Sequence, residues 1–210
     1  MTNLDKLIAG RRSIRKYKQE PIPEGSIEAM ILAAMKAPSP SNSQPVRFIR
    51  IRSTEIKTLL RNDMQDGREN LLKAITDTGS SKRLRNLVNV YWRFSEFMFN
   101  APVLFAIGAS LKSLSLAERL ETAGVRERTH KKHRDMDIAV GLALKGYLLK
   151  GEELCLGSCI LTAPLIFTEE PEKILSVERI EIKCFITTGY PDEEPVYIKR
   201  RDIADIYREV

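Results

Sequence analysis

The 210-residue sequence predicts a single α+β domain spanning residues 1–210, in which helices supply much of the core. Several segments repeat apolar residues at helical spacing, whereas only three have the composition of strands, which is a thin sheet for this length. No internal repeat or low-complexity linker divides the chain. Its length suits one sizeable core and is short for two.

The N-terminal part is predicted to contain three helices and one strand. A short apolar stripe over residues 4–10 predicts a first helix. Apolar residues at i, i+3, i+4 and i+7 predict a second helix over 24–37, which prolines then stop. The β-branched and aromatic run at 46–51 predicts a strand. A further helix is expected to begin near Ser53 or Thr54, where a hydroxyl can cap it.

The middle of the chain is less regular. Residues 62–82 are polar and contain glycine, and we interpret them as an insertion or a lid. A helical stripe predicts a helix from about residue 84 to 98. The apolar run at 102–109 predicts a strand buried on both faces. Residues 111–134 are strongly charged.

Two core elements and a basic tail complete the predicted fold. Alanine and glycine recur along a helical stripe from Met136 to Leu149, which predicts close contact with another helix. Alternation from Ile180 to Ile186 predicts the last core strand. The segment Tyr190-Pro191-Asp192 is expected to turn the chain before the tail.

The composition narrows the possible surroundings and partners. The chain is 43% hydrophobic and 30% charged, and no stretch approaches the roughly 18 to 20 uncharged apolar residues of a membrane span. The N-terminus lacks a signal-peptide pattern, so we expect a cytoplasmic protein with no membrane partner. The net charge of +6 could attract nucleic acid, an anionic cofactor or a phosphorylated substrate. The cations are dispersed and no nucleic-acid motif accompanies them, so we expect no nucleic-acid partner.

The cysteines and histidines do not predict a metal site. Cys155 and Cys159 are four residues apart and are expected to share a helix face as buried thiols, and Cys184 is also expected to be a buried structural thiol. His130 and His133 could form a His-x-x-His pair. The cations around them would repel a metal ion, so we interpret this segment as a solvated face and expect no metal.

Two basic clusters could bind phosphate. Arg11-Arg12-Ser13-Ile14-Arg15 places three guanidinium groups and a hydroxyl within five residues, and the guanidinium fork suits phosphate oxygens. A solvated basic turn is the alternative. Lys199-Arg200-Arg201 follows the turn at Gly189–Pro195 and could complete the same phosphate site.

A third constellation lies between the second helix and the first strand. Residues 37–45, Ala-Pro-Ser-Pro-Ser-Asn-Ser-Gln-Pro, hold small hydroxyl and amide side chains between prolines. Such a loop suits hydrogen bonding to a flat heterocycle with several donors and acceptors. An ordinary polar connection is the alternative.

The order of these motifs resembles the nitroreductase family of FMN-dependent oxidoreductases. The shared features are Arg-Arg-Ser-x-Arg at 11–15, Ala-Pro-Ser-x-x-Asn-x-Gln-Pro at 37–45, Gly-Tyr-Pro at 189–191 and a Lys-x-Arg ending at 199–201. The helix at 137–144 and the Leu-Gly turn within 154–159 are also similar to that family's central helix and its following turn.

The resemblance implies a nitroreductase-like sandwich, with a central, mostly antiparallel sheet flanked by helices. It also implies a homodimer with FMN at the interface and a C-terminal extension that reaches the partner. The FMN contacts implied by position are Arg11, Arg12 and Ser13 at the phosphate, joined by Lys199 and Arg201; Arg15 near the pyrimidine edge; Pro38, Ser39, Asn42 and Gln44 at the ring, some on the partner's cofactor; and the backbone of Thr162 and Ala163 near N5.

The implied activity is hydride transfer from NADH or NADPH to a small aromatic acceptor, such as a nitroarene or quinone, by a ping-pong mechanism. The cofactor carries this chemistry, so no catalytic side chain is assigned. Three departures from the family pattern leave the acceptor open: Pro40, Val46 and the segment Leu161–Pro164. The alternatives are a reductive dehalogenase, a flavin-fragmenting enzyme and a non-catalytic flavin-binding module.

Overall fold

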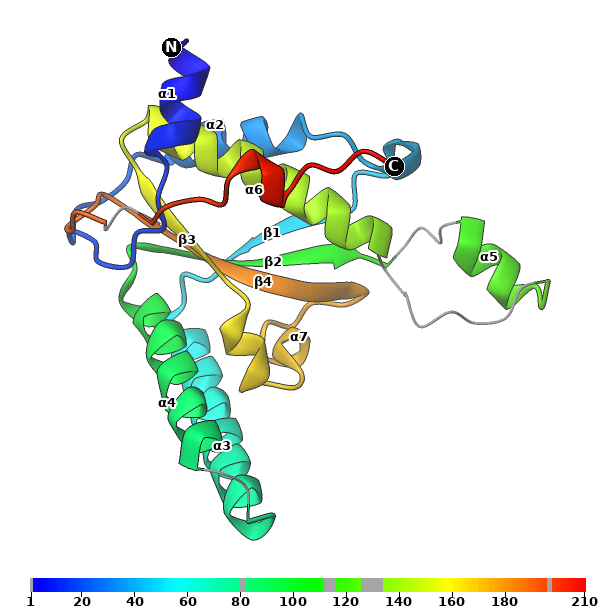
Figure 1. The fold of residues 1–210 in the computed structure, drawn as a ribbon. Helices are drawn as coiled ribbons and strands as arrows, with labels where there is room; N and C mark the ends of the chain where they lie inside the picture. The colour runs from blue at the N-terminus through cyan, green and yellow to red at the C-terminus, as the bar shows by residue number, and fades with distance from the viewer. Residues whose placement is uncertain (1, 80–81, 112–115, 126–133, 196–197) are drawn as a thin grey trace.

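A four-stranded antiparallel sheet forms the centre of the computed structural model, which describes residues 2–79, 82–111, 116–125, 134–195 and 198–210 (Figure 1). The strand order is β1-β2-β4-β3, and every neighbouring pair is antiparallel. The strands are β1 (Val46–Arg50), β2 (Val103–Ser110), β3 (Gly157–Leu161) and β4 (Ile180–Gly189). The predicted α+β architecture, with an antiparallel sheet between helices, is confirmed.

Helices cover both faces of the sheet, so β2 is buried along its whole length as predicted (Figure 1). Side chains alternate along the strand. Val103 and Phe105 pack in the core under α2 (Glu24–Met35) and α6 (Arg134–Glu153). Leu104 and Ala106 pack in a second core on the opposite side, under α3 (Thr54–Asp77) and α4 (Lys82–Glu96).

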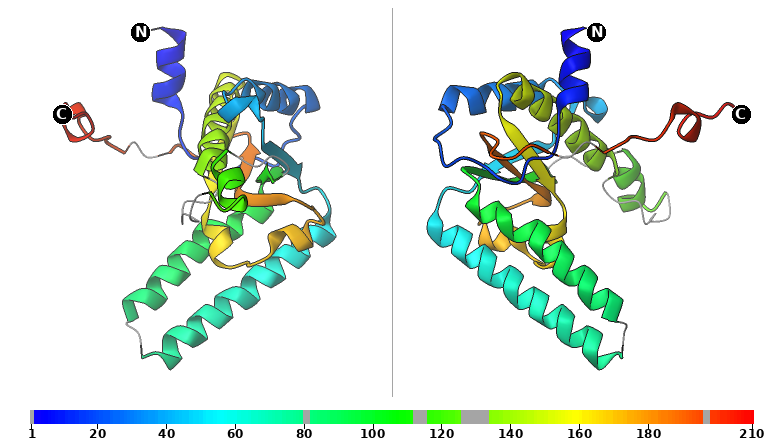
Figure 2. Two further views of the ribbon diagram at one scale, coloured as in Figure 1. Left: turned by 90° about the vertical axis from the view of Figure 1, so that its right-hand side faces the viewer. Right: turned by 60° about the vertical axis from the view of Figure 1, so that its left-hand side comes forward.

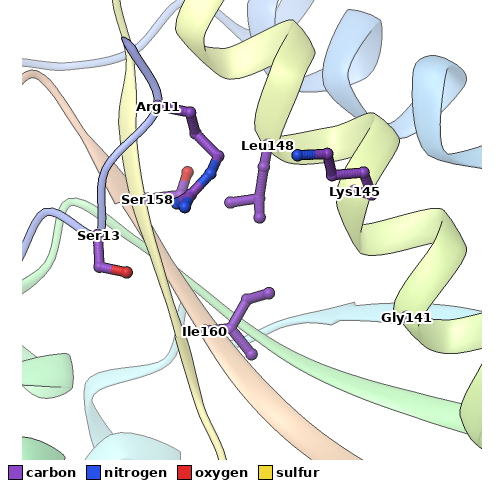
Figure 3. A pocket seen from close by; sticks show the side chains of 7 residues that line it. All are labelled: Arg11, Ser13, Gly141, Lys145, Leu148, Ser158 and Ile160. Atoms are coloured by element: carbon purple, nitrogen blue, oxygen red, sulfur yellow. The ribbon is translucent and has the colours of Figure 1, made fainter. Parts of the chain in front are cut away.

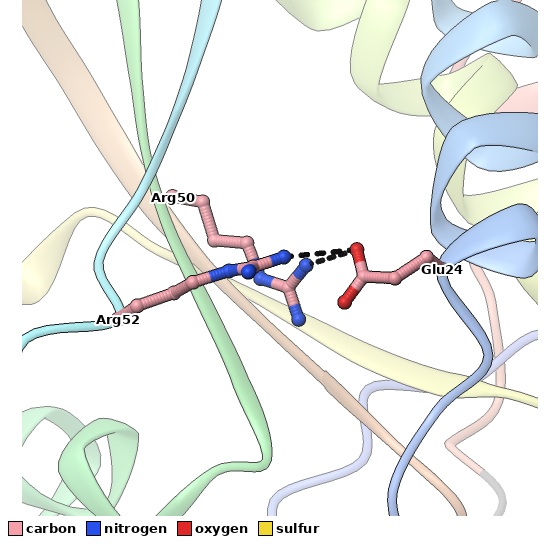
Figure 4. Close-up of polar contacts among 3 residues, drawn as sticks. All are labelled: Glu24, Arg50 and Arg52. Carbon is pink, nitrogen blue, oxygen red and sulfur yellow. Dashed lines mark hydrogen bonds and ion pairs between the residues drawn. The ribbon is translucent and has the colours of Figure 1, made fainter.

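The predicted close contact of the small-residue helix is confirmed between α6 and α2. A Cβ atom on Gly146 would lie 2.8 Å from the carbonyl oxygen of Ala33, closer than side chains tolerate. Glu24 at the start of α2 is tied to the end of β1, because its carboxylate contacts Arg50 at 2.6 Å and Arg52 at 2.9 Å (Figure 4). The hydrogen bond from Arg50 is the main cause that lowers the pKa of Glu24.

The interpretation of residues 62–82 as an insertion or a lid stays a prediction, but most of the segment is helical, which was not predicted. Helix α3 runs through it to Asp77, and the Ser53 side chain caps that helix as predicted. Gly67 does not break the helix. It provides space, because a Cβ there would lie 2.0 Å from the carbonyl oxygen of Phe167. Together α3 and α4 form a long hairpin that projects from the sheet (Figures 1 and 2).

The strand β3 was not predicted, and it corrects the expected position of two cysteines. Cys155 and Cys159 do not share a helix face. Cys155 lies in the turn after α6, with a positive φ of 57°, and is exposed, whereas Cys159 lies in β3 and is buried. Cys184 is buried as expected.

The remaining elements are short. They are α1 (Asn3–Gly10), α5 (Leu116–Thr122), α7 (Pro171–Ile174) and the 3-10 helices η1 (Pro40–Asn42), η2 (Phe97–Asn100), η3 (Ala163–Ile166) and η4 (Ile203–Asp205). The C-terminal residues 198–210 are all exposed and extend away from the sheet (Figure 2). His130 and His133 lie outside the described residues. No helix within the described ranges is long and apolar enough to cross a membrane.

Candidate functional site

The N-terminal basic segment is held against one end of the sheet. Ser13 forms a bridge to Ser158 at the start of β3, and the Ile14 N–H donates to the Ser158 carbonyl at 3.2 Å. This approach requires Gly157, because a Cβ there would lie 2.5 Å from Ile14 Cγ1. Gly189, which pairs with Gly157 in the sheet, similarly leaves room for the ring of Tyr17.

Tyr17 and Glu193 fix the course of this segment. The Tyr17 hydroxyl donates to the Ile14 carbonyl and forms a 2.7 Å hydrogen bond with Thr187 Oγ1. Burial raises the pKa of this phenol well above its usual value. The Glu193 carboxylate accepts from the backbone N–H groups of Arg15 and Lys16. The turn after β4 therefore lies beside the first basic cluster.

A pocket of about 320 Å³ lies between this segment, β3 and α6 (Figure 3). Its lining residues are Arg11, Ser13, Gly141, Lys145, Leu148, Ser158 and Ile160. Arg11 and Ser13 were predicted, whereas Lys145 and Ser158 were missed. The weak signals for them are a lysine one turn after Gly141 in the central helix and a serine directly after its Leu-Gly turn.

Positive charge gathers at this pocket without a matching carboxylate. Within the described part of the chain, neither Arg11 nor Lys145 forms an ion pair, whereas Lys150 on the same helix pairs with Glu153 at 2.5 Å. Burial raises the pKa of the Cys159 thiol beside the pocket, and the charge of Arg15 and a hydrogen bond with Ser13 partly oppose this shift.

The pocket walls suit an anion rather than a metal ion. Two cations and the hydroxyls of Ser13 and Ser158 are donors for a phosphate group. Ser158 is itself fixed, because its Oγ lies 3.0 Å from Thr188 Oγ1, which is 2.9 Å from the buried Tyr147 hydroxyl. Among the described residues, no group of three or more His, Cys, Asp or Glu side chains could hold a metal ion.

Arg12 and Arg15 do not line the pocket. The Arg12 guanidinium donates to carbonyls at the end of α1, at 2.6 Å to Ala9 and 2.8 Å to Arg11. The Arg15 guanidinium lies 5.6 Å from the centre of the Phe94 ring, near the end of α4. Arg12 therefore stabilises a helix terminus, and Arg15 marks the side of the site that faces the hairpin.

The loop at residues 38–44 lies at the other end of the sheet. Ser110, the last residue of β2, donates its N–H to the Pro45 carbonyl at 2.8 Å. The pocket adjoins the opposite end of the strand, where Val103 pairs with Thr188 and Thr188 with Ser158. Seven residues of β2 separate the two ends, or about 24 Å. None of the loop residues lines the pocket, although η1 within the loop contacts α6, the helix that carries Gly141 and Lys145.

Comparison of the sequence with models of protein families assigns the chain to a family. The model of the nitroreductase family matches residues 8–190. The chain belongs to the nitroreductase family.

Individual relatives cover nearly all of this nitroreductase-family chain. A Bacillus subtilis protein, provisionally named NAD(P)H nitroreductase YfhC, is 28% identical over 97% of this chain and 92% of its own. The structure of a BluB-like flavoprotein from Clostridium difficile matches with a TM-score of 0.84 and 22% identity, covering 100% of both chains. Iodotyrosine deiodinase bound to FMN and 3-iodo-L-tyrosine matches with a TM-score of 0.70 and 23% identity, over 98% of this chain and 100% of that one.

The other sequence-predicted residues of this family member lie outside the pocket. Thr162 is exposed after the last residue of β3, and Ala163 begins η3. Four residues along the edge strand, or about 13 Å, separate Thr162 from Ser158. Lys199 and Arg201 are exposed in the C-terminal tail, where Lys199 lies 3.8 Å from Asp202.

The polar loop at 38–44 has a constrained backbone. Ser41, Asn42 and Gln44 all have positive φ angles, which non-glycine residues adopt only at a cost. The Ser39 hydroxyl accepts from the Gln44 N–H at 2.9 Å, and the Gln44 amide donates to Asn42 Oδ1 at 3.1 Å. Pro38, Asn42 and Gln44 are nevertheless exposed, so the loop presents preformed polar groups to solvent.

Proposed function

We propose that residues 1–210 form one FMN-binding domain of an NAD(P)H-dependent oxidoreductase, which reduces a small aromatic acceptor by a ping-pong mechanism. The observation that carries this proposal is the anion pocket. In a chain of the nitroreductase family, Arg11 and Ser13 line a pocket at the edge strand, where the order of motifs predicted the phosphate of FMN. Arg and hydroxyl donors are well matched to phosphate oxygens.

The chain's own residues bind and orient the cofactor in this proposal. The pocket takes the phosphate, and the edge strand β3 leads from Ser158 to Thr162 and Ala163 at the position proposed for the ring. Arg15 supplies positive charge on the hairpin side of the same region. Bound FMN would supply hydride transfer between the nicotinamide and the acceptor, so no side chain is assigned as an acid, base or nucleophile.

We further propose that the active form is a homodimer with an FMN site at each side of the interface. In this proposal the loop at 38–44 contributes to the partner's FMN site, because the loop adjoins the Ser110 end of β2 and none of its residues lines the pocket of its own protomer. Ile138 and Leu142 give α6 an exposed apolar face with fractional exposures of 52% and 44%. The C-terminal tail, with Ile203, is exposed along its length and is proposed to reach the partner.

Absorbance and turnover test the proposal together. The purified protein, with FMN added where needed, should show flavin absorption bands that remain with the protein on gel filtration. It should oxidise NADH or NADPH when a quinone or nitroarene is present, and analytical ultracentrifugation should give twice the chain mass. Absence of retained flavin contradicts the cofactor assignment. Retained flavin without turnover of either nicotinamide contradicts the oxidoreductase assignment and agrees with a non-catalytic flavin-binding module or a flavin enzyme of another reaction type.

A flavin enzyme of another reaction type is the second candidate. The likeness to a BluB-like flavoprotein over the whole chain and to iodotyrosine deiodinase favours this alternative, although each likeness establishes only the fold. Mass spectrometry of the cofactor after reduction under oxygen separates the possibilities. Loss of FMN mass indicates flavin fragmentation, release of iodide from 3-iodo-L-tyrosine indicates dehalogenation, and reduction of a nitroarene or quinone with intact FMN supports the first proposal.

A further inference from the structure

Lys145 extends into the pocket from the wall opposite Arg11. It lies on α6, about one turn after Gly141, and its side chain and that of Arg11 point toward the same space (Figure 3). No motif of the sequence analysis included Lys145, and the proposed FMN contacts do not use it. Lys145 lies 134 positions after Arg11 in the sequence, and the fold brings both side chains to one pocket.

The surroundings of Lys145 differ from those of a lysine that is neutralised on the protein surface. Lys150, on the same helix, is paired with Glu153 at 2.5 Å, and Lys183 contacts both Asp137 and Glu181. Lys145 and Arg11 share a pocket with no carboxylate among its lining residues. Two like charges that face one space repel each other, and an anion between them reverses this unfavourable term.

We propose that Lys145 is a phosphate-binding residue, which forms with Arg11 a two-cation site for a phosphomonoester dianion and so selects FMN over riboflavin. This inference rests on the proposed FMN function and deepens it. A phosphomonoester carries close to two negative charges at neutral pH, because its second pKa is about 6. Within the pocket, Arg11 supplies one positive charge toward this dianion and the Lys145 ammonium supplies a second. Ser13 and Ser158 line the same space with hydroxyl donors.

The test compares the affinity of apoprotein for FMN and for riboflavin by quenching of flavin fluorescence. Lys145→Met keeps the aliphatic stem and removes the charge. This substitution should weaken FMN binding about tenfold, which is the value of a charge-assisted hydrogen bond lowered to allow for the solvent exposure of this lysine. It should change riboflavin binding less than about twofold. Lys145→Arg should recover most of the loss. Lys150→Met is the matched control on the same helix and should leave both affinities unchanged.

Salt and pH give a second readout that a purely structural role would not change. The preference of wild-type protein for FMN over riboflavin should fall as pH decreases through about 6, where the phosphate becomes a monoanion, and as salt increases. Both dependences should be weaker in Lys145→Met.

The outcomes separate this inference from the proposed function. Equal loss of FMN and riboflavin affinity in Lys145→Met, or no loss of either, overturns the role of Lys145 while leaving FMN binding intact. If wild-type apoprotein binds neither flavin, the proposed function itself fails. Failure of Lys145→Arg to recover FMN affinity after a selective loss in Lys145→Met also overturns the role of charge.

Discussion

Gly157→Ala should displace the segment that carries the pocket residues Arg11 and Ser13. The added Cβ would lie 2.5 Å, 2.7 Å and 3.0 Å from Cγ1, Cβ and Cγ2 of Ile14. Ordinary carbon contacts are about 3.5–4.0 Å, so Ile14 must move by roughly 1 Å. Ile14 is buried, with 5% exposure, and overpacking of this kind costs about 1–3 kcal/mol. Because Ser13 and Ile14 pair with Ser158, the displacement also moves the pocket wall.

Urea denaturation measures this cost, and flavin titration measures its effect on the site. The free energy of unfolding should fall by about 1–3 kcal/mol with an unchanged m-value, and FMN affinity should fall as well. Gly25→Ala is the control, because a Cβ there meets nothing within 4 Å in helix α2 and should be neutral or stabilising by up to about 1 kcal/mol.

A double-mutant cycle with Ile14→Ala tests the stated cause. Ile14→Ala alone should destabilise by about 2–5 kcal/mol, because it leaves a cavity. In combination with Gly157→Ala it removes two of the three clashing atoms, so the double variant should lose less than the sum of the single losses. Strict additivity, or a Gly157→Ala protein as stable as wild type, would refute the argument that Gly157 is required by close packing.

Three further predictions follow from local packing and charge. Gly146→Ala should lower the melting temperature in calorimetry, because the new methyl group would meet a backbone carbonyl of α2, and unchanged stability would contradict the close approach. Burial lowers the pKa of Lys183, but the hydrogen bonds and charges of Glu181 and Asp137 outweigh burial and raise it. The contribution of Lys183 to folding stability should therefore be complete below about pH 10 and be lost as pH rises through the folded pKa. In urea titrations, the stability advantage of wild type over Lys183→Met should shrink at alkaline pH. A thiol reagent should modify Cys155 alone in native protein, because burial raises the pKa of both other cysteines, and rapid modification of three thiols would contradict their burial.

The sequence patterns predicted the elements whose burial is regular. Helix α6 and strand β2 were predictable because the former repeats small and apolar residues at helical spacing and the latter is apolar throughout. The short strand β3 was missed, because five residues with an exposed Ile160 give little periodic signal, and its pairing with β4 is not local. A strand of this kind is defined by its partner and not by its own composition.

The helical structure of residues 62–82 was not predicted for a different reason. The α3–α4 hairpin projects into solvent, so only a narrow face of α3 is buried, including Leu60, Met64 and Ile75. Most positions are therefore polar, which resembles the composition of a loop. Gly67 added to this impression, although its role is to let the helix approach Phe167. The requirement for glycine at position 67 depends on a contact with Phe167, which lies 100 positions later in the sequence.

The candidate site was predictable only where its residues are neighbours in sequence. Arg11 and Ser13 belong to one short cluster, and the structure places both at the pocket. Lys145 enters the same pocket from α6, and only the packing of that helix on the sheet reveals it. The loop at 38–44 and the tail residues Lys199 and Arg201 do not line this pocket in a single protomer, so their proposed roles depend on dimer formation and remain predictions.

Subunit complementation tests whether each site is shared between protomers. One variant carries Arg11→Glu in the pocket. The other carries Ser39→Gly, Asn42→Gly and Gln44→Gly in the loop, where glycine tolerates the positive φ of Asn42 and Gln44. Each homodimer has two defective sites and should retain little NADH oxidation. After refolding of an equal mixture, half of the dimers are mixed, and each mixed dimer contains one site with an intact pocket and the partner's intact loop.

The expected recovery follows from counting sites. Half of the dimers are mixed, and one of the two sites in each mixed dimer is intact. The mixture should therefore show about a quarter of wild-type activity, which is above the mean activity of the two parent variants. If pocket and loop served the same protomer's cofactor, every site in the mixture would carry one defect and activity would stay at the parental mean. Because no loop residue lines the pocket of its own chain, recovery is expected, and its absence in a mixture shown to contain mixed dimers would rule out the shared site.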